Sequence, residues 1–121
     1  MNLIDRQRDT LTKIQTVAQA MGVDPAWAAA VAMVESSLGI NQKSPTGCRG
    51  VFQMSGIAMR DLLQEMERQD DDLVDIACGI AFLHLLLRRH GSIDAATAKF
   101  CDPKDRDFYV ERVRGYMEVF R

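Results

Sequence analysis

Residues 24–37 read DPAWAAAVAMVESS, and this stretch decides the fold. Asp24 is suited to cap a helix and Pro25 to occupy its first position, so the pair is a strong helix-start signal. The residues that follow are almost all apolar as far as Val34. A helix that is apolar on every side is typically buried at the centre of its domain. We therefore expect Pro25 to about Ser37 to form the central helix of the molecule.

Five more helices are expected around this centre, and strand signals are almost absent. Apolar residues at helical spacing, with Gly22 as a C-cap, predict a helix from Ile4 to Met21. The other helices are expected over residues 55–67, 73–90, 92–100 and 105–120. The last helix should bury one face, made of Phe108, Val113, Tyr116, Met117 and Phe120. The predicted fold class is therefore all-α.

Length and charge limit the kind of protein that this chain can be. It has 121 residues, of which 47% are apolar, so we expect one packed domain over residues 1–121. Lys and Arg number 15 and Asp and Glu 17, which gives a formal net charge of −2. This balance argues against a nucleic-acid partner bound on a broad basic face, although it is compatible with a local basic groove.

The cysteines and the N-terminus exclude further classes. Cys48, Cys78 and Cys101 form no C-x-x-C pair, so neither a zinc ribbon nor a disulfide scaffold is expected, while one disulfide stays possible. Charged residues come too early in residues 1–9 for a signal peptide. No apolar run approaches the ~20 residues that a membrane span needs. We expect a chain without signal peptide or membrane span, which something else must carry if it acts outside the cytoplasm.

Residues 38–54 differ from the rest because they are rich in residues that interrupt helices. Gly39, Asn41, Ser44, Pro45, Gly47 and Gly50 all fall in this segment. They predict an irregular loop with room for a short hairpin. Loops of about 15 residues are uncommon in small domains and are more often functional than not.

Glu35 is the candidate catalytic residue, because it ends the apolar helix and faces this loop. Burial beside Val31 and Val34 would disfavour its charged form and raise its pKa. A carboxylic acid that stays partly protonated near neutrality can protonate a glycosidic oxygen. On helical periodicity alone, the commoner case is a solvated glutamate at a frayed helix end. The loop residues Gly50–Gln53 favour the first interpretation, since Gln53 can bind a polar ligand while Val51 and Phe52 anchor the loop.

The segments 34–37, VESS, and 44–53, SPTGCRGVFQ, resemble the soluble lytic transglycosylase family, which is related to goose-type lysozymes. The family pattern is Glu-Ser followed by Ser-Pro-x-Gly-Ala-x-Gly-Leu-Met-Gln. Cys48 stands here for the alanine, and Val51 and Phe52 stand for the leucine and methionine. The resemblance continues through residues 75–83, which are similar to the family's Asn-Ile … Gly … Tyr-Leu helix, and residues 109–113, which are similar to its Tyr-Val-x-x-Val closing helix. It covers roughly residues 13 to 120.

The resemblance implies a lysozyme-like, goose-type helical domain of about six helices with an irregular active-site loop. It implies cleavage of the β-1,4 bond between N-acetylmuramic acid and N-acetylglucosamine in peptidoglycan glycan strands. Glu35 would act as acid and then as base, assisted by the substrate's acetamido group, to leave 1,6-anhydro ends; hydrolysis of the lysozyme type is the other outcome. No metal and no cofactor are implied. Ser36, Gln53, Phe52 and Phe100 would bind substrate or support the glutamate.

One motif departs from the family pattern. Residues 99–103, KFCDP, stand where the family has Ala-Tyr-Asn-x-Gly beside the cleft. Phe100 keeps the ring and loses the hydroxyl, so a hydrogen bond worth ~1 kcal/mol is lost. The resemblance also places Cys48 and Cys101 at the cleft, where a disulfide would clamp it; three free thiols are the simpler expectation. This departure favours the alternative of a non-catalytic glycan-binding or structural module, whereas the retention of Glu35 and Gln53 disfavours it.

The implied substrate also bears on where the protein works. Without a signal peptide, we expect delivery to the periplasm or cell wall as part of a phage virion or tail, through a secretion assembly, or within a longer chain. The negative net charge counts against an enzyme that finds an anionic wall by free diffusion, since such an enzyme gains from a basic surface, whereas a protein delivered by an assembly needs less electrostatic steering.

Overall fold

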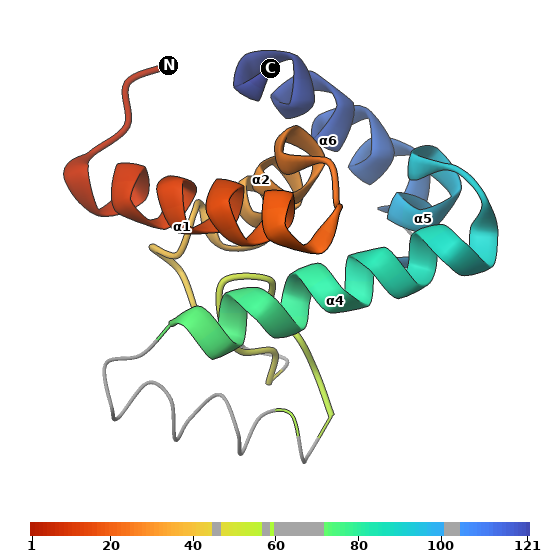
Figure 1. Cartoon of the computed structure of the whole chain (residues 1–121), viewed down its shortest axis with the longest axis horizontal. Helices are drawn as coiled ribbons and strands as arrows, with labels where there is room; N and C mark the ends of the chain where they lie inside the picture. Colours follow the sequence, from red (N-terminus) through yellow and green to blue (C-terminus); the bar gives the residue numbers. More distant parts are fainter. Residues whose placement is uncertain (45–46, 57–58, 60–71, 101–104) are drawn as a thin grey trace.

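Five helices make up most of the described part of the chain in the computed structural model, which covers residues 1–44, 47–56, 59, 72–100 and 105–121. With the labels of Figure 1, they are α1 (Asp5–Met21), α2 (Pro25–Ser36), α4 (Leu73–His90), α5 (Ile93–Phe100) and α6 (Arg106–Phe120). The all-α fold class is confirmed. The helix expected over residues 55–67 falls almost wholly outside the described residues.

The helix ends follow the capping signals in the sequence. The Asp24 carboxylate accepts hydrogen bonds from the backbone N–H groups of Ala26 (2.9 Å) and Trp27 (3.3 Å), and Pro25 occupies the first helical position. Gly22 and Gly91 end α1 and α4 with φ values of 71° and 83°, in the left-handed region that glycine adopts without strain. These stops turn the chain between consecutive helices.

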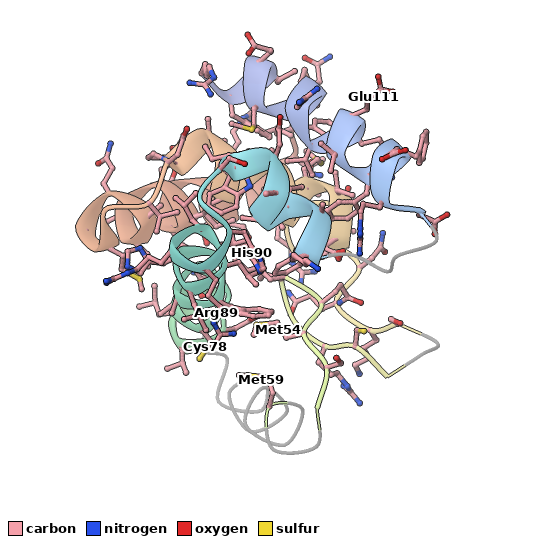
Figure 2. The ribbon with its side chains drawn as sticks, turned by 90° about the vertical axis from the view of Figure 1, so that its right-hand side faces the viewer. Met54, Met59, Cys78, Arg89, His90 and Glu111 are labelled. Carbon is pink, nitrogen blue, oxygen red and sulfur yellow. The ribbon has the colours of Figure 1, made fainter. Side chains whose placement is uncertain are left out.

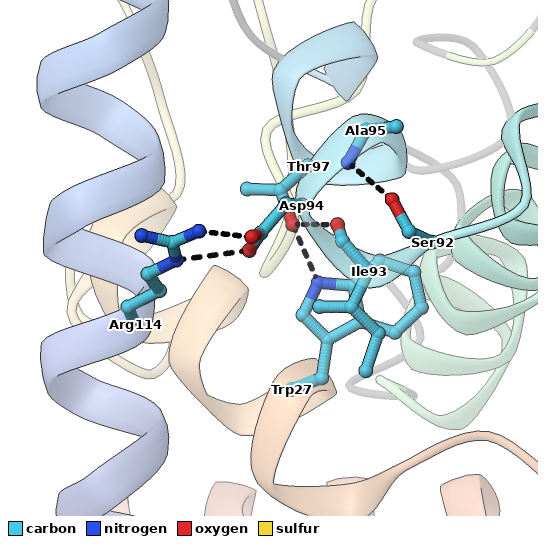
Figure 3. Close-up of polar contacts among 7 residues, drawn as sticks. All are labelled: Trp27, Ser92, Ile93, Asp94, Ala95, Thr97 and Arg114. Carbon is cyan, nitrogen blue, oxygen red and sulfur yellow. Dashed lines mark hydrogen bonds and ion pairs between the residues drawn. The ribbon is translucent and has the colours of Figure 1, made fainter.

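Helix α2 forms the centre of the core, as its composition predicts. Nine of its residues are buried, from Ala26 to Met33 and again at Ser36. Figure 1 shows α2 in the middle of the view, with α1 and α6 on either side of it and α4 running beneath. Trp27 is fully buried, and its indole N–H donates a 2.9 Å hydrogen bond to the Thr97 hydroxyl of α5 (Figure 3). The most apolar segment of the chain is thus joined to the shortest described helix.

Side-chain hydrogen bonds and an ion pair hold the short helix α5 to its neighbours. The Ser92 hydroxyl caps its start by accepting from the Ala95 N–H at 3.1 Å. The Arg114 guanidinium of α6 forms an ion pair with Asp94 through two N–H groups, one of them at 3.0 Å from the carboxylate (Figure 3). Both partners are exposed, so the pair orients α5 on α6 while contributing little to stability.

The buried face of α6 differs from the expected one. Tyr109, Val113 and Met117 are the buried residues, whereas Phe108 is 66% exposed. The four-residue spacing of the buried residues keeps them on one stripe, and Phe108 lies about 100° away from that stripe. Its ring faces the Arg112 guanidinium instead, 5.8 Å from the ring centroid. The inclusion of Phe108 in the inner face was therefore wrong.

The segment after α2 is an irregular loop, as expected, with two isolated β-bridges in place of strands. These bridges join Lys43 to Arg49 and Arg49 to Met54. The second is a reciprocal pair of backbone hydrogen bonds between Arg49 and Met54, at 2.9 and 2.8 Å. They fold the loop back on itself beside the start of α4.

Phe52 attaches this loop to α4. Its ring is fully buried against Gly79, where an added Cβ would lie 2.2 Å from the ring. A glycine is required at this position because the ring occupies the space of a side chain.

Replacement of Gly79 by alanine should therefore displace the Phe52 ring and lower the free energy of unfolding by about 1–3 kcal/mol. The matched control is Gly115→Ala on α6, where nothing lies within 4 Å of the added Cβ. That change should leave stability unchanged or raise it by up to about 1 kcal/mol. Urea denaturation of both variants measures the difference. Equal stabilities would contradict the packing of Phe52 on Gly79.

Candidate functional site

Glu35 lies in the last turn of α2, at the point where the buried helix reaches the loop. The chain leaves the helix sharply, because Ser37 (φ 55°) and Leu38 (φ 54°) both adopt the left-handed region. Residues other than glycine seldom do so, and two in succession mark a backbone that the surrounding structure holds in place. Glu35 is thereby kept at the helix end and half-buried.

Burial makes the Glu35 carboxyl group a weaker acid than an ordinary glutamate. Removal from water raises the pKa of Glu35 to about 7, since the charged form loses hydration. The Tyr109 hydroxyl of α6 donates a hydrogen bond to Oε1 at 3.3 Å, which opposes the rise. Near neutral pH the carboxyl group is therefore divided between its protonated and ionised forms. Such a group can both give and take a proton.

Tyr109 is the site residue to which the sequence analysis assigned no role. It comes 74 positions after Glu35, so no local pattern joins the two residues. The available signal was the spacing of Tyr109 with Val113 and Met117, which places its ring on the buried stripe of α6. Glu111, which follows shortly after on the same helix, points away from the rest of the molecule (Figure 2) and is exposed.

The loop that follows α2 is held through the peptide groups of Val51. The Ser36 hydroxyl, next to Glu35 in the chain, donates to the Val51 carbonyl at 2.5 Å and accepts from the Gly39 N–H at 2.9 Å. On the other side, Oδ2 of Asp75 in α4 accepts from the Val51 N–H at 2.9 Å. Val51 is therefore held from α2 and from α4 at once.

The other two loop residues named by the sequence analysis lie beside Val51. Phe52 is fully buried, and so is Ser36, at 1% exposure. Gln53 is half-buried with φ 51°, and its side-chain N–H donates to the Gly50 carbonyl at 2.9 Å. This bond orients the Gln53 amide at the turn of the loop.

A family comparison gives this geometry a context. The family model described as Transglycosylase SLT domain matches residues 12–98, well over half of the chain. The chain belongs to this family. No curated protein and no solved structure matches it. The match includes Glu35, the loop and Asp75, and it ends before Phe100 and Tyr109.

Membership of the SLT family confirms the resemblance drawn from the sequence. The family generally consists of transglycosylases, and its substrate is the peptidoglycan of the cell wall. The helices described above agree with the all-α, lysozyme-like fold that the resemblance implies. None of the helices in the described ranges has the length and apolar character needed to cross a membrane.

Phe100, at the end of α5, lies against another ring. Its centroid is 5.6 Å from that of Phe82 in α4, with a tilt of 43°, and it is half-buried. It contributes an apolar surface between α4 and α5. Residues 101–104, which complete the departing motif of this SLT domain, lie outside the described residues.

The other carboxylates, histidines and cysteines named so far form no second catalytic or metal site in the part of the chain that the structure describes. Asp94 is ion-paired with Arg114 on the exposed side of α5, and Asp61 and Asp102 lie outside the described residues. No group of three or more His, Cys, Asp and Glu side chains in that part is arranged to hold a metal ion. A disulfide between Cys48 and Cys101, to which three free thiols are the simpler alternative, would involve a residue outside the described ranges.

The Tyr109 hydroxyl lowers the pKa of Glu35, so its removal should raise that pKa further above 7. In Tyr109→Phe, only burial acts on the carboxyl group. Carbon-13 NMR of the Glu35 carboxyl carbon during a pH titration measures the change. The control is Tyr116→Phe on the same helix, whose ring stacks on Phe120 and should leave the titration as it is. A Tyr109→Phe titration that coincides with that of the wild type would show that the hydrogen bond has no effect.

Proposed function

We propose that this SLT domain cleaves the β-1,4 bond between N-acetylmuramic acid and N-acetylglucosamine, with Glu35 as its single general acid and base. The observation that carries the proposal is the half-buried carboxyl group of Glu35, whose pKa of about 7 leaves both proton states populated at neutral pH. An ordinary glutamate at the surface would be ionised there and could not protonate a leaving group.

The first step begins with Glu35 protonated. Its proton passes to the glycosidic oxygen as the bond from that oxygen to the muramyl C1 breaks. The acetamido carbonyl oxygen of the same sugar forms a bond to C1, which closes a positively charged ring. Glu35 is left as a carboxylate, and the hydroxyl of Tyr109 then stabilises the new charge by donating to Oε1.

In the second step Glu35 acts as a base. The carboxylate takes the proton of the muramyl 6-hydroxyl as that oxygen attacks C1, and the bond from the acetamido oxygen to C1 breaks. The product is a 1,6-anhydro end, and Glu35 is protonated again. Among the described residues no neighbouring carboxylate contributes to the pKa of Glu35, which is set by burial and Tyr109. This favours assistance by the substrate over a two-carboxylate scheme.

The other site residues receive supporting roles in this proposal. The buried Ser36 and Phe52 act by holding the loop, instead of touching the sugar. Gln53, oriented by its bond to the Gly50 carbonyl, binds the glycan strand at the turn of the loop. Phe100 forms an apolar wall that excludes water from the reacting carbon.

We also infer that the enzyme works in the periplasm or cell wall, where its substrate lies. Its net charge of −2 suits delivery by an assembly, such as a phage virion or tail or a secretion machine, better than a search of the wall by free diffusion.

Glu35→Gln tests the catalytic assignment, because it keeps the shape of the side chain and removes the transferable proton. Clearing of a purified peptidoglycan suspension should fall by about 100-fold or more while the fold is kept. Glu111→Gln, on the exposed face of α6, is the matched control and should clear at the wild-type rate. Clearing by Glu35→Gln at nearly the wild-type rate would contradict the proposal. A wild-type protein that binds peptidoglycan without cutting it would indicate the non-catalytic alternative.

The products separate transglycosylation from hydrolysis. The 6-hydroxyl is part of the bound sugar, so it reaches C1 at a high effective concentration when water is excluded. We expect 1,6-anhydromuramyl ends to dominate the digest, each lighter by one water than a hydrolysed end in mass spectrometry. Mainly reducing muramyl ends would show lysozyme-type hydrolysis. They would direct attention to Asp61, Asp94 and Asp102 as activators of water.

A further inference from the structure

Asp75, in the first turn of α4, is a buried carboxyl group that the proposed reaction does not use. It is 4% exposed, and its Oδ2 accepts from the Val51 N–H at 2.9 Å. Its Oδ1 is buried with no hydrogen-bond partner among the described residues. Buried polar atoms are nearly always paired, so an unpaired carboxylate oxygen calls for an explanation.

The backbone of the loop lies directly against this carboxyl group. A Cβ added to Gly50 would be 2.5 Å from Asp75 Oδ1, and Gly50 has φ +87°. Glycine is therefore needed here for its small size as well as its conformation. The loop cannot move toward α4 without meeting Asp75.

The contact reaches the reacting group through Val51. Its N–H bonds to Asp75, and its carbonyl accepts from the hydroxyl of Ser36, the residue after Glu35. Gln53 in turn bonds to the carbonyl of Gly50, which precedes Val51. Asp75 is thus linked to Glu35 only through the loop, because it holds the segment that carries Gln53 and meets the end of α2.

The charged state of Asp75 depends on its surroundings. Burial raises the pKa of Asp75 to about 6, the Val51 N–H opposes this rise, and the charge of Asp72, the N-cap residue of α4, adds a smaller contribution to it. From α1, Lys13 faces the carboxylate of Asp72 at 3.0 Å. Burial, and then the charge of Asp75, raise the pKa of the Cys78 thiol in the next turn of α4. From the loop, the Val51 N–H faces the carboxylate of Asp75. From α2, Ser36 is linked to Asp75 only through the Val51 carbonyl.

We propose that Asp75 is a positioning residue whose ionised carboxylate holds the Gly50–Gln53 loop against the end of α2, next to Glu35 in the chain, and that the hold weakens when Asp75 is protonated. An ionised acceptor makes a hydrogen bond roughly twice as strong as a neutral one. The inference rests on the proposed function for its effect on catalysis. It adds a second titrating group to the site. Activity then falls at acidic pH because Asp75 loses its charge, and at alkaline pH because Glu35 loses its proton.

Asp75→Asn tests the proposal through catalysis. The amide keeps an oxygen acceptor for the Val51 N–H, but it cannot gain or lose a proton in this pH range. We expect kcat at pH 7 to fall by about fivefold. The acidic limb of the pH profile of kcat/KM should disappear while the alkaline limb remains. Asp5→Asn, which removes a fully exposed carboxylate of α1, is the control and should keep both limbs. An acidic limb retained in Asp75→Asn would overturn the proposal.

Stability should change in the opposite direction to activity. Folded Asp75 binds its proton more tightly than unfolded Asp75, because its pKa is raised from 3.8 to about 6. The Tm should therefore fall as the pH rises through this range, and removal of the carboxylate should prevent that part of the fall. The comparison is made in Glu35→Gln, so that Glu35 does not contribute. If the Tm of Glu35→Gln and of the double variant with Asp75→Asn fell equally, Asp75 would not titrate as proposed.

A measurement on the loop itself keeps the proposal separate from the enzymatic function. In Glu35→Gln, the nitrogen-15 shift of the Val51 amide should show one step near pH 6, where Asp75 ionises. No step at Val51 would overturn the hold, even if Asp75→Asn failed to fold. If the wild type cut no peptidoglycan but the step were present, the proposed function would fail and the hold would stand.

Discussion

The desolvation of Glu35 is the constraint on which the rest of the site depends. Helix α2 is apolar on every side, so α1 and α6 enclose it and its last turn emerges at the loop with only partial access to water. A carboxyl group placed there loses hydration of its charged form, and the Tyr109 hydroxyl of α6 offsets part of this loss. A more polar α2 would not be enclosed in this way, and it would leave Glu35 an ordinary surface acid.

Much of this arrangement could be predicted from local features of the sequence. The Asp24-Pro25 start, the Gly22 and Gly91 stops and the Ser92 cap locate helix ends because capping is a short-range interaction. The apolar run of α2 predicts burial, and burial predicts the direction of the pKa change of Glu35. These steps need only neighbouring residues and one general property of water.

The parts that escaped prediction depend on contacts between distant segments. The pairing of Tyr109 with Glu35 requires the position of α6 on α2, which no local pattern contains. Phe108 was assigned to the wrong face because one hydrophobic residue at the start of a helix is compatible with two stripes. Ser36 is expected to bind substrate or support the glutamate, and the bonds of its hydroxyl to Val51 and Gly39 could not be read from the sequence. The family resemblance includes Ser36 and Tyr109, but it does not show which hydrogen bonds these residues make.

The bond between Trp27 and Thr97 has a spectroscopic consequence. The chain contains one tryptophan, and its indole is fully buried with its N–H bonded to α5. Its fluorescence emission therefore reports on one place, the contact between the central helix and α5, without a background from other indoles. A blue-shifted emission band marks the state in which α5 is docked, and a red shift marks its release into water. The single tryptophan therefore reports optically on the docking of α5 against α2.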